Sequence, residues 1–329
     1  SVTRVEPQHG VAGTHVLVRG LNFPQSAELS CQFGDTVAPA MWLSATEAKC
    51  FAPTQAAAGS ATVWVGISTN GVASAAPGNT GGPTFEFRSL PVVLAVEPAS
   101  APISGGTAVT VIASGLALAG GGTHQCRFGD ALAAVPASRV NDTALRCWVP
   151  KAASNATVQL RVSTNGFDFS AGVDFVLAPA VWIFSIHPSS APMSGNTVVS
   201  LNGAGFVNSS TLGCRFDYES TVVKTSATFV NSALVQCAVP LFGSAGSATV
   251  EVTSNGVDYS SESRVLLLRA TETLRDLRPG SGPTTGGSVV RVRGTNFVDS
   301  SSLCCMFSEA AGSFQRSVAA EWISVVEVS

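Results

Sequence analysis

A short sequence motif recurs at a nearly constant interval along this chain. An apolar residue, a variable residue and a proline occur together four times, at Pro7, Pro98, Pro188 and Pro279, which are 91, 90 and 91 residues apart. Each copy is followed by a glycine-containing turn, an alternating apolar segment and a Cys-x-Phe step. A fixed period of one small-domain length indicates a linear array of modules. We expect three complete repeats and a truncated fourth, at 1–90, 91–180, 181–271 and 272–329.

Within a repeat, the apolar residues follow the period of a β-strand. Val16 and Val18 alternate with His15 and Leu17, and the same alternation returns in the other copies, which predicts a half-buried strand. Later in each of the first three repeats, an Asn-Gly pair such as Asn165-Gly166 lies between two strand-like segments and predicts a hairpin. We find no helical pattern. Short strands separated by frequent turns predict an all-β chain of tandem β-sandwich domains.

Charge and hydropathy exclude two classes of partner. Charged residues make up 12% of the 329 residues and the formal net charge is −3, so no basic stripe is present to neutralise nucleic-acid phosphates. Hydrophobic residues make up 45% of the chain, but no apolar run approaches the roughly 20 residues of a membrane span. We therefore expect neither nucleic-acid binding nor direct membrane insertion of this segment.

Six of the eight cysteines occupy the same two places in each of the first three repeats. The pairs are Cys31 with Cys50, Cys126 with Cys147, and Cys214 with Cys237. No Cys-x-x-Cys or Cys/His cluster favours zinc, so we predict three disulfides and an oxidising compartment. Closing such a loop is worth about 3 kcal/mol in the chain-entropy model.

Three sequons support the same compartment, because they predict N-glycans on Asn141, Asn155 and Asn208. With the cysteines they favour a secreted protein that is extracellular or attached to the cell surface. Ser1 already lies within the first repeat, so we expect that any leader peptide has been removed or lies outside this segment.

Two neighbouring cysteines in the fourth repeat depart from the pattern. Cys305 takes the in-register place, and its expected partner falls immediately after Ser329, beyond the end of this segment. Cys304 has no counterpart in the other repeats, and because adjacent strand residues point to opposite faces we expect it to face outward. It is an exposed unpaired thiol, a cysteine that pairs beyond residue 329, or an intermolecular link. The equivalent positions hold Ser30, Gln125 and Gly213.

The sequence offers no constellation for catalysis, and we predict that the chain is not an enzyme and binds no cofactor. No phosphate-loop, zinc-protease or nucleophile-elbow motif is present. The histidines fall at different places in different repeats, which predicts solvent-facing side chains; they are His9, His15, His124 and His187. Asp168 and Asp258 follow Asn-Gly pairs and could serve a calcium site, but a single carboxylate favours turn stabilisation, so we predict no metal site.

Trp64 is the most informative aromatic residue. It lies between Val63 and Val65 at a position that is polar in the next two repeats. An exposed tryptophan there would mark a surface contact. A loop that folds over the ring, such as the Gly/Pro/Asn-rich stretch Ala75–Pro83, explains it equally well.

Together these elements resemble the IPT/TIG immunoglobulin-like domain. The second repeat shows the pattern most fully, as Pro98, Gly105-Gly106-Thr107, Cys126-Arg127-Phe128-Gly129, Cys147-Trp148-Val149-Pro150 and Asn165-Gly166. The resemblance covers essentially the whole chain and implies tandem immunoglobulin-like sandwiches. The family it resembles includes plexin-like receptor ectodomains, fibrocystin-type surface proteins, accessory domains of starch-degrading enzymes and Rel-type transcription factors, so the fold does not choose the function.

The leading functional hypothesis is an extracellular structural or adhesive array. Short links without a flexible Gly/Ser tether predict stiff coupling between repeats, so the modules would act as spacers and as contact surfaces for other protein chains. A surface coat, a filament or a ciliary, mastigoneme-like appendage fits, and the Ala-rich, Lys-poor composition favours an algal or protist source. The alternatives are a ligand-binding ectodomain of a plexin-like receptor and, less favoured, an accessory carbohydrate-binding module of an enzyme.

Overall fold

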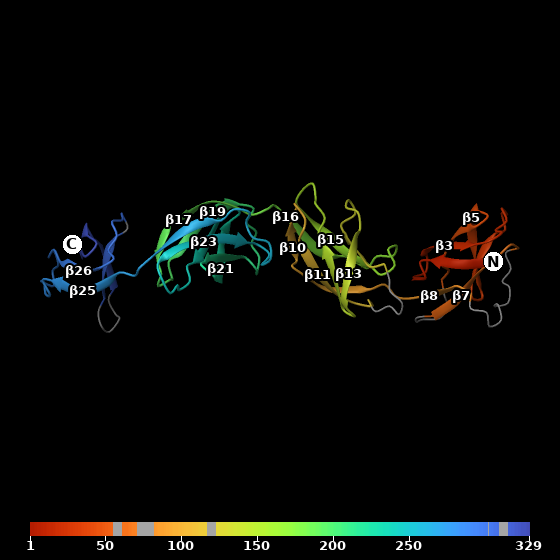
Figure 1. Ribbon diagram of the computed structural model, residues 1–329, viewed down its shortest axis with the longest axis horizontal. Helices are drawn as coiled ribbons and strands as arrows, with labels where there is room; N and C mark the ends of the chain where they lie inside the picture. The colour runs from red at the N-terminus through yellow and green to blue at the C-terminus, as the bar shows by residue number, and fades with distance from the viewer. Residues whose placement is uncertain (55–60, 71–81, 117–122, 302, 309–314) are drawn as a thin grey trace. The chain divides into compact units, whose positions relative to one another are not determined.

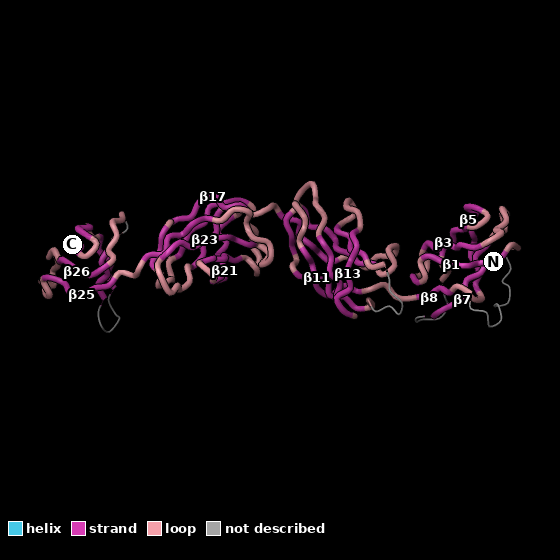
Figure 2. The backbone as a smooth tube through the Cα atoms, viewed as in Figure 1, coloured by secondary structure: helices cyan, strands magenta, loops and turns pink. Residues whose placement is uncertain are grey.

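The computed structural model describes residues 1–54, 61–70, 82–116, 123–301, 303–308 and 315–329. Every regular element in these ranges is a β-strand (Figures 1 and 2), which confirms the all-β prediction. Among the same residues there is no helix of the length and apolarity that a membrane crossing requires. The chain divides into two compact units, Ser1–Ala180 and Val181–Ser329.

The first repeat is a sandwich of two β-layers. One layer has the order β1-β3-β6-β5, and the other contains β4, β7 and β8, with β2 added parallel to β8. Strand β5 belongs to both layers, because its first half pairs with β4 and its second half with β6. The strands are β1 (Val2–Glu6), β2 (His9–Gly10), β3 (His15–Gly20), β4 (Ser30–Phe33), β5 (Thr36–Ser44), β6 (Glu47–Phe51), β7 (Ala61–Ser68) and β8 (Thr84–Phe87).

The second and third repeats have the same strand order. The second contains β9 (Val92–Glu97), β10 (Ser100–Pro102), β11 (Ala108–Ser114), β12 (Gln125–Phe128), β13 (Val135–Asn141), β14 (Ala144–Trp148), β15 (Ala156–Ser163) and β16 (Val173–Ala178). The third contains β17 (Trp182–His187), β18 (Ser190–Pro192), β19 (Val198–Ala204), β20 (Gly213–Tyr218), β21 (Thr221–Asn231), β22 (Leu234–Ala238), β23 (Gly246–Thr253) and β24 (Arg264–Arg269).

The fourth repeat contains the counterparts of the first strands of a sandwich. A four-stranded sheet has the order β25-β26-β30-β29, and a separate hairpin pairs β27 with β28. The strands are β25 (Thr273–Arg278), β26 (Arg291–Thr295), β27 (Cys304–Ser308), β28 (Gln315–Ala319), β29 (Trp322–Ser324) and β30 (Glu327–Val328).

Each complete repeat has its own core between the two layers. Val16 and Val18 are fully buried whereas His15 is exposed, as the alternation predicted. The cysteine pairs are disulfide-bonded, and Cys31–Cys50 joins β4 in one layer to β6 in the other. The Phe of the Cys-x-Phe step packs edge-on against a second buried ring, with centroids 5.6 Å apart for Phe33 and Phe85.

In three repeats, a glycine at or near the end of the strand that follows the glycine-containing turn makes room for an aromatic ring; these strands are β3, β19 and β26. A Cβ on Gly203 would meet the carbonyl oxygen of Trp182 and lie 2.6 Å from the Phe206 ring, and the same arrangement recurs in the first and fourth repeats. The second repeat has Ala113 and Leu116 at these two places. Where the strand residue is alanine, the residue that packs against it is therefore the smaller leucine, and where it is glycine, that residue is phenylalanine. The sizes of the two residues are coupled.

Gly203→Ala is expected to lower the free energy of unfolding of the third repeat by about 1–3 kcal/mol, because overpacking outweighs the smaller backbone-entropy gain of alanine. The Gly203→Ala/Phe206→Leu variant should recover part of this loss, since it recreates the pair found in the second repeat. Hydrogen exchange followed peptide by peptide through a denaturant series measures both. Equal stability of the single variant and the native chain would contradict the explanation.

Candidate functional site: the junction of the first two repeats

The site is built around the loop that connects β15 to β16. Asn165 Oδ1 accepts hydrogen bonds from the backbone N–H groups of Phe167 and Asp168, both at 2.9 Å. Gly166 has φ +80°, a conformation that glycine adopts without strain, and its N–H donates to Ser163 Oγ at 2.9 Å. The Asn165 Nδ2 group donates to Asp168 Oδ2 at 2.7 Å. One asparagine thus fixes both the turn and the position of the aspartate carboxylate.

The first repeat contacts this turn through its own glycine-containing loop. Thr14 Oγ1 donates to Asp168 Oδ2 at 2.6 Å, and Asn165 Nδ2 donates to the carbonyl oxygen of His9 at 2.9 Å. Gly10 allows this approach, because a Cβ there would lie 2.8 Å from Asp168 Oδ2. We call these two contacts, Thr14 with Asp168 and Asn165 with His9, the junction lock. The first is the stronger, because a hydrogen bond to a carboxylate is about twice as strong as a neutral one.

His9 closes the junction on one side. Its Nε2 atom lies 3.2 Å from Thr164 Oγ1, and β2 places His9 opposite Glu86 of β8. Burial lowers the pKa of His9 from its ordinary value, and the positive charge of Arg88 lowers it further. Three weaker effects raise this pKa: the negative charge of Glu86, the hydrogen bond with Thr164 and the negative charge of Asp168. The contact between the two repeats therefore favours the neutral imidazole of His9.

The sign of this shift gives a pH prediction. The pKa of His9 is lower when the two repeats are in contact than when they are apart, so the neutral imidazole stabilises the contact. This stabilisation is complete above the ordinary pKa of about 6.5 and is lost as pH falls through the lowered pKa. After correction for intrinsic rates, amide exchange around residues 9–14 should accelerate at mildly acidic pH. His9→Gln should remove that pH dependence, whereas His187→Gln, at an exposed site of the third repeat, should not. If amide exchange around residues 9–14 still depended on pH in His9→Gln, a group other than His9 would be its cause.

The structure corrects the prediction that the histidines face solvent. His15 and His187 are exposed, but His9 is half-buried at the junction. His124 is also buried, with Nε2 3.4 Å from the carbonyl oxygen of Leu116. Variation among repeats identified neither, because a repeat-specific residue can occupy a contact between repeats or a loop of the core as readily as the surface.

Asp168 has a larger role than the predicted one. As expected of a turn residue, its backbone N–H donates to Asn165 Oδ1 and its carboxylate accepts from Asn165 Nδ2. It also joins two repeats, because the carboxylate accepts the hydroxyl of Thr14. In the described parts of the chain, no group of three or more His, Cys, Asp or Glu side chains could hold a metal ion. Sequence reasoning missed Thr14, although a hydroxyl residue at this place in every repeat was an available signal; the others are Thr107, Thr197 and Ser288.

Trp64 is half-buried on β7, and its ring lies across Gly66, where a Cβ would contact it. Because Gly66 has no side chain on this face of the strand, the Trp64 ring packs against the backbone there, and this contact covers part of the ring. The loop proposed to cover it, Ala75–Pro83, lies mostly outside the described residues. Contact of Trp64 with a partner remains a prediction.

The three predicted glycosylation sites are exposed. Asn141 ends β13, and its Oδ1 atom accepts hydrogen bonds from the N–H of Thr143 at 2.9 Å and from its hydroxyl at 3.1 Å. Asn155 precedes β15, and Asn208 lies between β19 and β20. All three side chains are therefore accessible for modification, and their occupancy remains a prediction.

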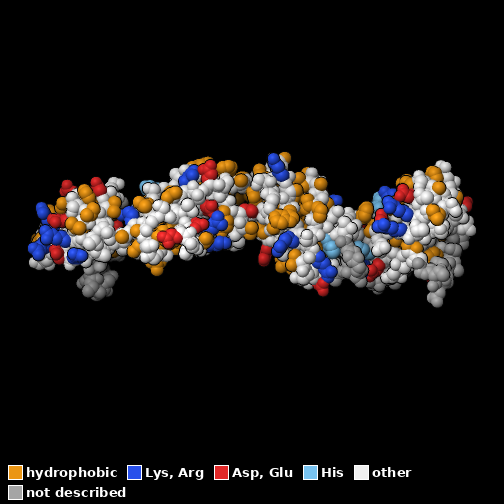
Figure 3. All heavy atoms as spheres, viewed as in Figure 1, with side chains coloured by type: hydrophobic (Ala, Val, Ile, Leu, Met, Phe, Trp, Pro, Cys, Tyr) orange, Lys and Arg blue, Asp and Glu red, His pale blue; other side chains and the backbone are white. Residues whose placement is uncertain are grey.

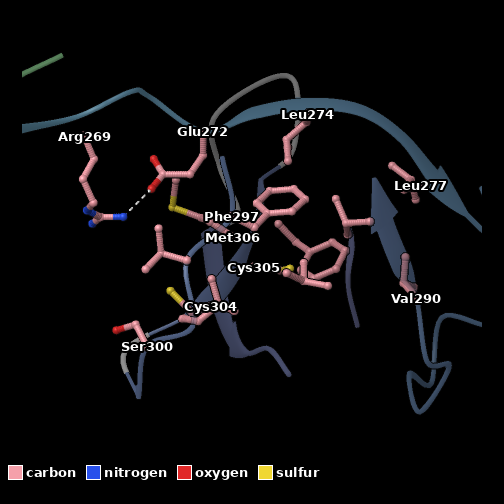
Figure 4. Close-up of a pocket in the computed structure, with 15 residues that line it drawn as sticks. Arg269, Glu272, Leu274, Leu277, Val290, Phe297, Ser300, Cys304, Cys305 and Met306 are labelled. Atoms are coloured by element: carbon pink, nitrogen blue, oxygen red, sulfur yellow. Dashed lines mark hydrogen bonds and ion pairs between the residues drawn. The ribbon is translucent and has the colours of Figure 1, made fainter. Parts of the chain in front are cut away.

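The neighbouring cysteines of the fourth repeat have different surroundings. Cys304 is exposed, and Cys305 is partly buried; burial, with the neighbouring thiol, raises the pKa of Cys305. Both line an apolar groove of about 530 Å³ that Phe307 also lines, and Figure 4 shows them with Phe297 among the lining side chains. A covalent link through Cys304 and a partner for Cys305 beyond residue 329 remain predictions.

Disulfide-linked, two-layered sandwiches repeated in tandem define the chain as an immunoglobulin-like repeat protein. Residues 1–87, 91–176 and 182–267 match the IPT/TIG domain. The chain belongs to the IPT/TIG family, as the sequence resemblance indicated. The fourth repeat is not among the matched segments and is recognised from its internal similarity and its strands.

Solved structures that the chain matches include the plexin A4 extracellular region. One plexin A4 structure is 13% identical over 99% of this chain and 28% of its own, with a TM-score of 0.42. A second is 16% identical over 100% of this chain and 44% of its own, with a TM-score of 0.30. The Escherichia coli adhesin FdeC is 14% identical over 81% and 96%, with a TM-score of 0.26. The chain thus spans less than half of either plexin A4 structure, and these likenesses carry no functional argument. No curated protein matches the chain.

Proposed function

We propose that this chain is a non-catalytic, extracellular structural or adhesive array, in which IPT/TIG repeats act as rigid spacers and as contact surfaces for other protein chains. The observation that carries the proposal is the junction lock, because Asp168 accepts the hydroxyl of Thr14 and Asn165 donates to the carbonyl oxygen of His9 across the two repeats. A spacer needs such contacts, since a flexible joint would not transmit orientation from one module to the next. A surface coat, filament or ciliary appendage is the setting that fits.

Two further features support an extracellular location. Each complete repeat has a disulfide between its layers, and disulfides persist in oxidising compartments. The three sequons lie on exposed asparagines, where glycans would not disturb the core.

An exposed apolar surface on the third repeat supports the contact role. Val265 and Leu267 alternate with buried leucines on β24 and are 59% and 48% exposed. Phe184 on β17 is 62% exposed, and its carbonyl oxygen accepts a hydrogen bond from Arg264 of β24. On the face drawn in Figure 3, hydrophobic side chains are exposed over the repeats and charges of both signs are intermixed. Exposed apolar side chains on two strands that a hydrogen bond connects fit protein contacts.

The distance between two spin labels tests the spacer role. We would place labels at the exposed positions Met41 and Val140, one in each of the first two repeats, in a chain with Cys304→Ser and Cys305→Ser. A rigid junction predicts a distance distribution about as narrow as that of a control pair at Leu21 and Met41 within the first repeat. A distribution several times broader would refute the rigid spacer.

Peptide mapping without reduction, with and without glycosidase, tests the compartment on native material. The extracellular proposal predicts three intra-repeat disulfides and glycan on the sequons. Free thiols throughout, with unmodified asparagines, would replace it by an intracellular scaffold.

A ligand-binding receptor ectodomain is the second candidate, and the apolar surface of Phe184, Val265 and Leu267 favours it equally. Such a receptor needs a membrane span and a signalling domain elsewhere in the protein, so the full-length sequence distinguishes the two functions.

A further inference from the structure

The third repeat has a small pocket on the outer face of the sheet formed by β21, β20 and β23. The pocket has a volume of about 330 Å³, and Gly213 of β20 lines it. Gly213 faces outward, because its neighbour Cys214 is buried in the core and adjacent strand residues point to opposite faces. It is opposite Ser226 of β21 on one side and Thr253 of β23 on the other. Because glycine has no side chain, the face of the sheet is open at this point.

The second repeat has a long side chain at the same place. Gln125 takes the position of Gly213, directly before the disulfide-bonded cysteine of its strand. Its side chain reaches the turn of Gly166, where a Cβ would lie 3.6 Å from Gln125 Nε2. Gly256, the counterpart of Gly166 in the third repeat, lines the pocket. The opening over Gly213 is therefore a property of the third repeat and not a requirement of the fold.

Three polar side chains that line the pocket are also specific to the third repeat. They are Lys224, Ser226 and Tyr259, and the strand register and the isolated bridges place Ala134, Pro136 and Phe169 at these positions of the second repeat. The second repeat forms the same sandwich without these polar groups, so the fold does not need them. Polar groups that converge on one concave opening are typical of a ligand site.

Lys224 supplies the charge of the pocket. The neighbouring Arg215 forms an ion pair with Glu251, and its guanidinium carbon lies 4.1 Å from the centroid of the Tyr259 ring. The Lys224 side chain is exposed, with its ammonium 5.4 Å from the same centroid. A cation–ring contact at an exposed site is weak, and it leaves the N–H donors of the ammonium able to bind an anion. Lys224 is therefore the cation that a ligand would meet.

We propose that this pocket binds an acidic sugar, with the carboxylate or sulfate of the sugar on the Lys224 ammonium. The hydroxyls of Ser226 and Tyr259 can each donate and accept a hydrogen bond, as the hydroxyls of a sugar require. The volume is at the lower end of the roughly 300–1,000 Å³ of ligand pockets and suits a single sugar unit. This binding function goes beyond the spacer role and does not depend on it.

Titration of the full chain with methyl glucuronide and with galactose 6-sulfate, followed by saturation-transfer NMR, tests the proposal. Ser210, which completes the Asn208 sequon, also lines the pocket, so the chain is treated with glycosidase first. We expect an acidic sugar to bind, and the uncharged methyl glucoside to bind roughly tenfold more weakly, because it lacks the charge-assisted hydrogen bond. The comparison of the two acidic probes shows whether the pocket prefers a carboxylate or a sulfate.

Two variants introduce residues of the second repeat. Lys224→Ala changes an exposed side chain and should weaken binding roughly tenfold or more, as for the loss of a hydrogen bond to a charged group. Tyr259→Phe keeps the ring, removes only the hydroxyl and should weaken binding severalfold. Lys151→Ala, which removes an exposed lysine of the second repeat, serves as the control and should leave the affinity unchanged.

The assignment would be overturned if neither acidic sugar bound at millimolar concentration, if the uncharged glucoside bound equally well, or if Lys224→Ala kept the affinity of the native chain. Tighter binding of a tetraglutamate peptide than of either acidic sugar would also overturn it, since the site would then recognise protein carboxylates. Each of these results would leave the spacer proposal standing, because that proposal depends on the label distances across the first two repeats.

Discussion

Replacing Cys126 and Cys147 together by alanine is expected to lower the free energy of unfolding of the second repeat by about 3 kcal/mol or more. The disulfide joins residues 21 apart in sequence, and the chain-entropy model gives about 3 kcal/mol for a loop of this size. Both cysteines are fully buried, so the loss of packed sulfur adds to the effect. Since the bond connects β12 to β14, the two layers of the sandwich would be held by side-chain packing and by β13, which pairs with a strand of each layer.

The effect should be local, because repeats in an array draw their stability from themselves and their immediate neighbours. Peptide-resolved hydrogen exchange in a denaturant series should show an earlier transition for β11–β16 and little change for β19–β24. Cys304→Ser removes an exposed thiol that forms no disulfide in the described residues and serves as the control. An unchanged transition in the second repeat would contradict a stabilising role for the bond.

The strands and the core could be predicted from the sequence because they depend on local alternation. Val16 and Val18 are buried and His15 is exposed, as a period of two requires. Cys31 and Phe33, two residues apart, both face the core. Fourfold repetition strengthened each weak pattern, since a coincidence in one copy would not recur in register.

The Asn-Gly pairs of the second and third repeats were predicted correctly as hairpins, but not in their detail; the pair of the first repeat, Asn70-Gly71, lies partly outside the described residues. Strands β15 and β16 pair antiparallel as far as Leu160 opposite Val173, and an isolated bridge then joins Ser163 to Phe169, so the connection is longer than a two-residue turn. Asn165 contributes its side chain to the turn, and only Gly166 has a positive φ. A dipeptide signal predicts that a chain reverses, whereas the side-chain hydrogen bonds that shape the reversal depend on the following residues.

The junction could not be predicted from such patterns because it depends on how two folded repeats meet. Nothing local to His9 shows that its carbonyl oxygen accepts a hydrogen bond from a residue 156 positions away. Thr14 reads as an ordinary turn residue, and Asp168 as a turn stabiliser. The information was present only in the comparison between repeats, where the hydroxyl and the Asn-Gly-x-Asp sequence both recur.

Asp168→Ala is expected to destabilise the first repeat, although the substitution lies in the second. The variant removes the charged acceptor of the Thr14 hydroxyl, leaving the carbonyl oxygen of Val11, and frees Asn165 from its carboxylate partner. Hydrogen bonds to charged groups contribute about 1.5–3 kcal/mol each, so the first repeat should lose about 2 kcal/mol of interface stabilisation. Exchange in a denaturant series should show an earlier transition for β1–β8.

A double-mutant cycle with Thr14→Val separates the contact from other effects of each residue. If the lock is the source of the stability, Asp168→Ala should cost the first repeat little once Thr14 has lost its hydroxyl. The matched variant Asp258→Ala removes the equivalent carboxylate from the third repeat and should leave the transition of the first repeat unchanged. Strictly additive losses from the two substitutions would show that Thr14 and Asp168 act independently. The two repeats would then be joined by their covalent link and the remaining contacts, and the junction would lose its claim to be the rigid element of the array.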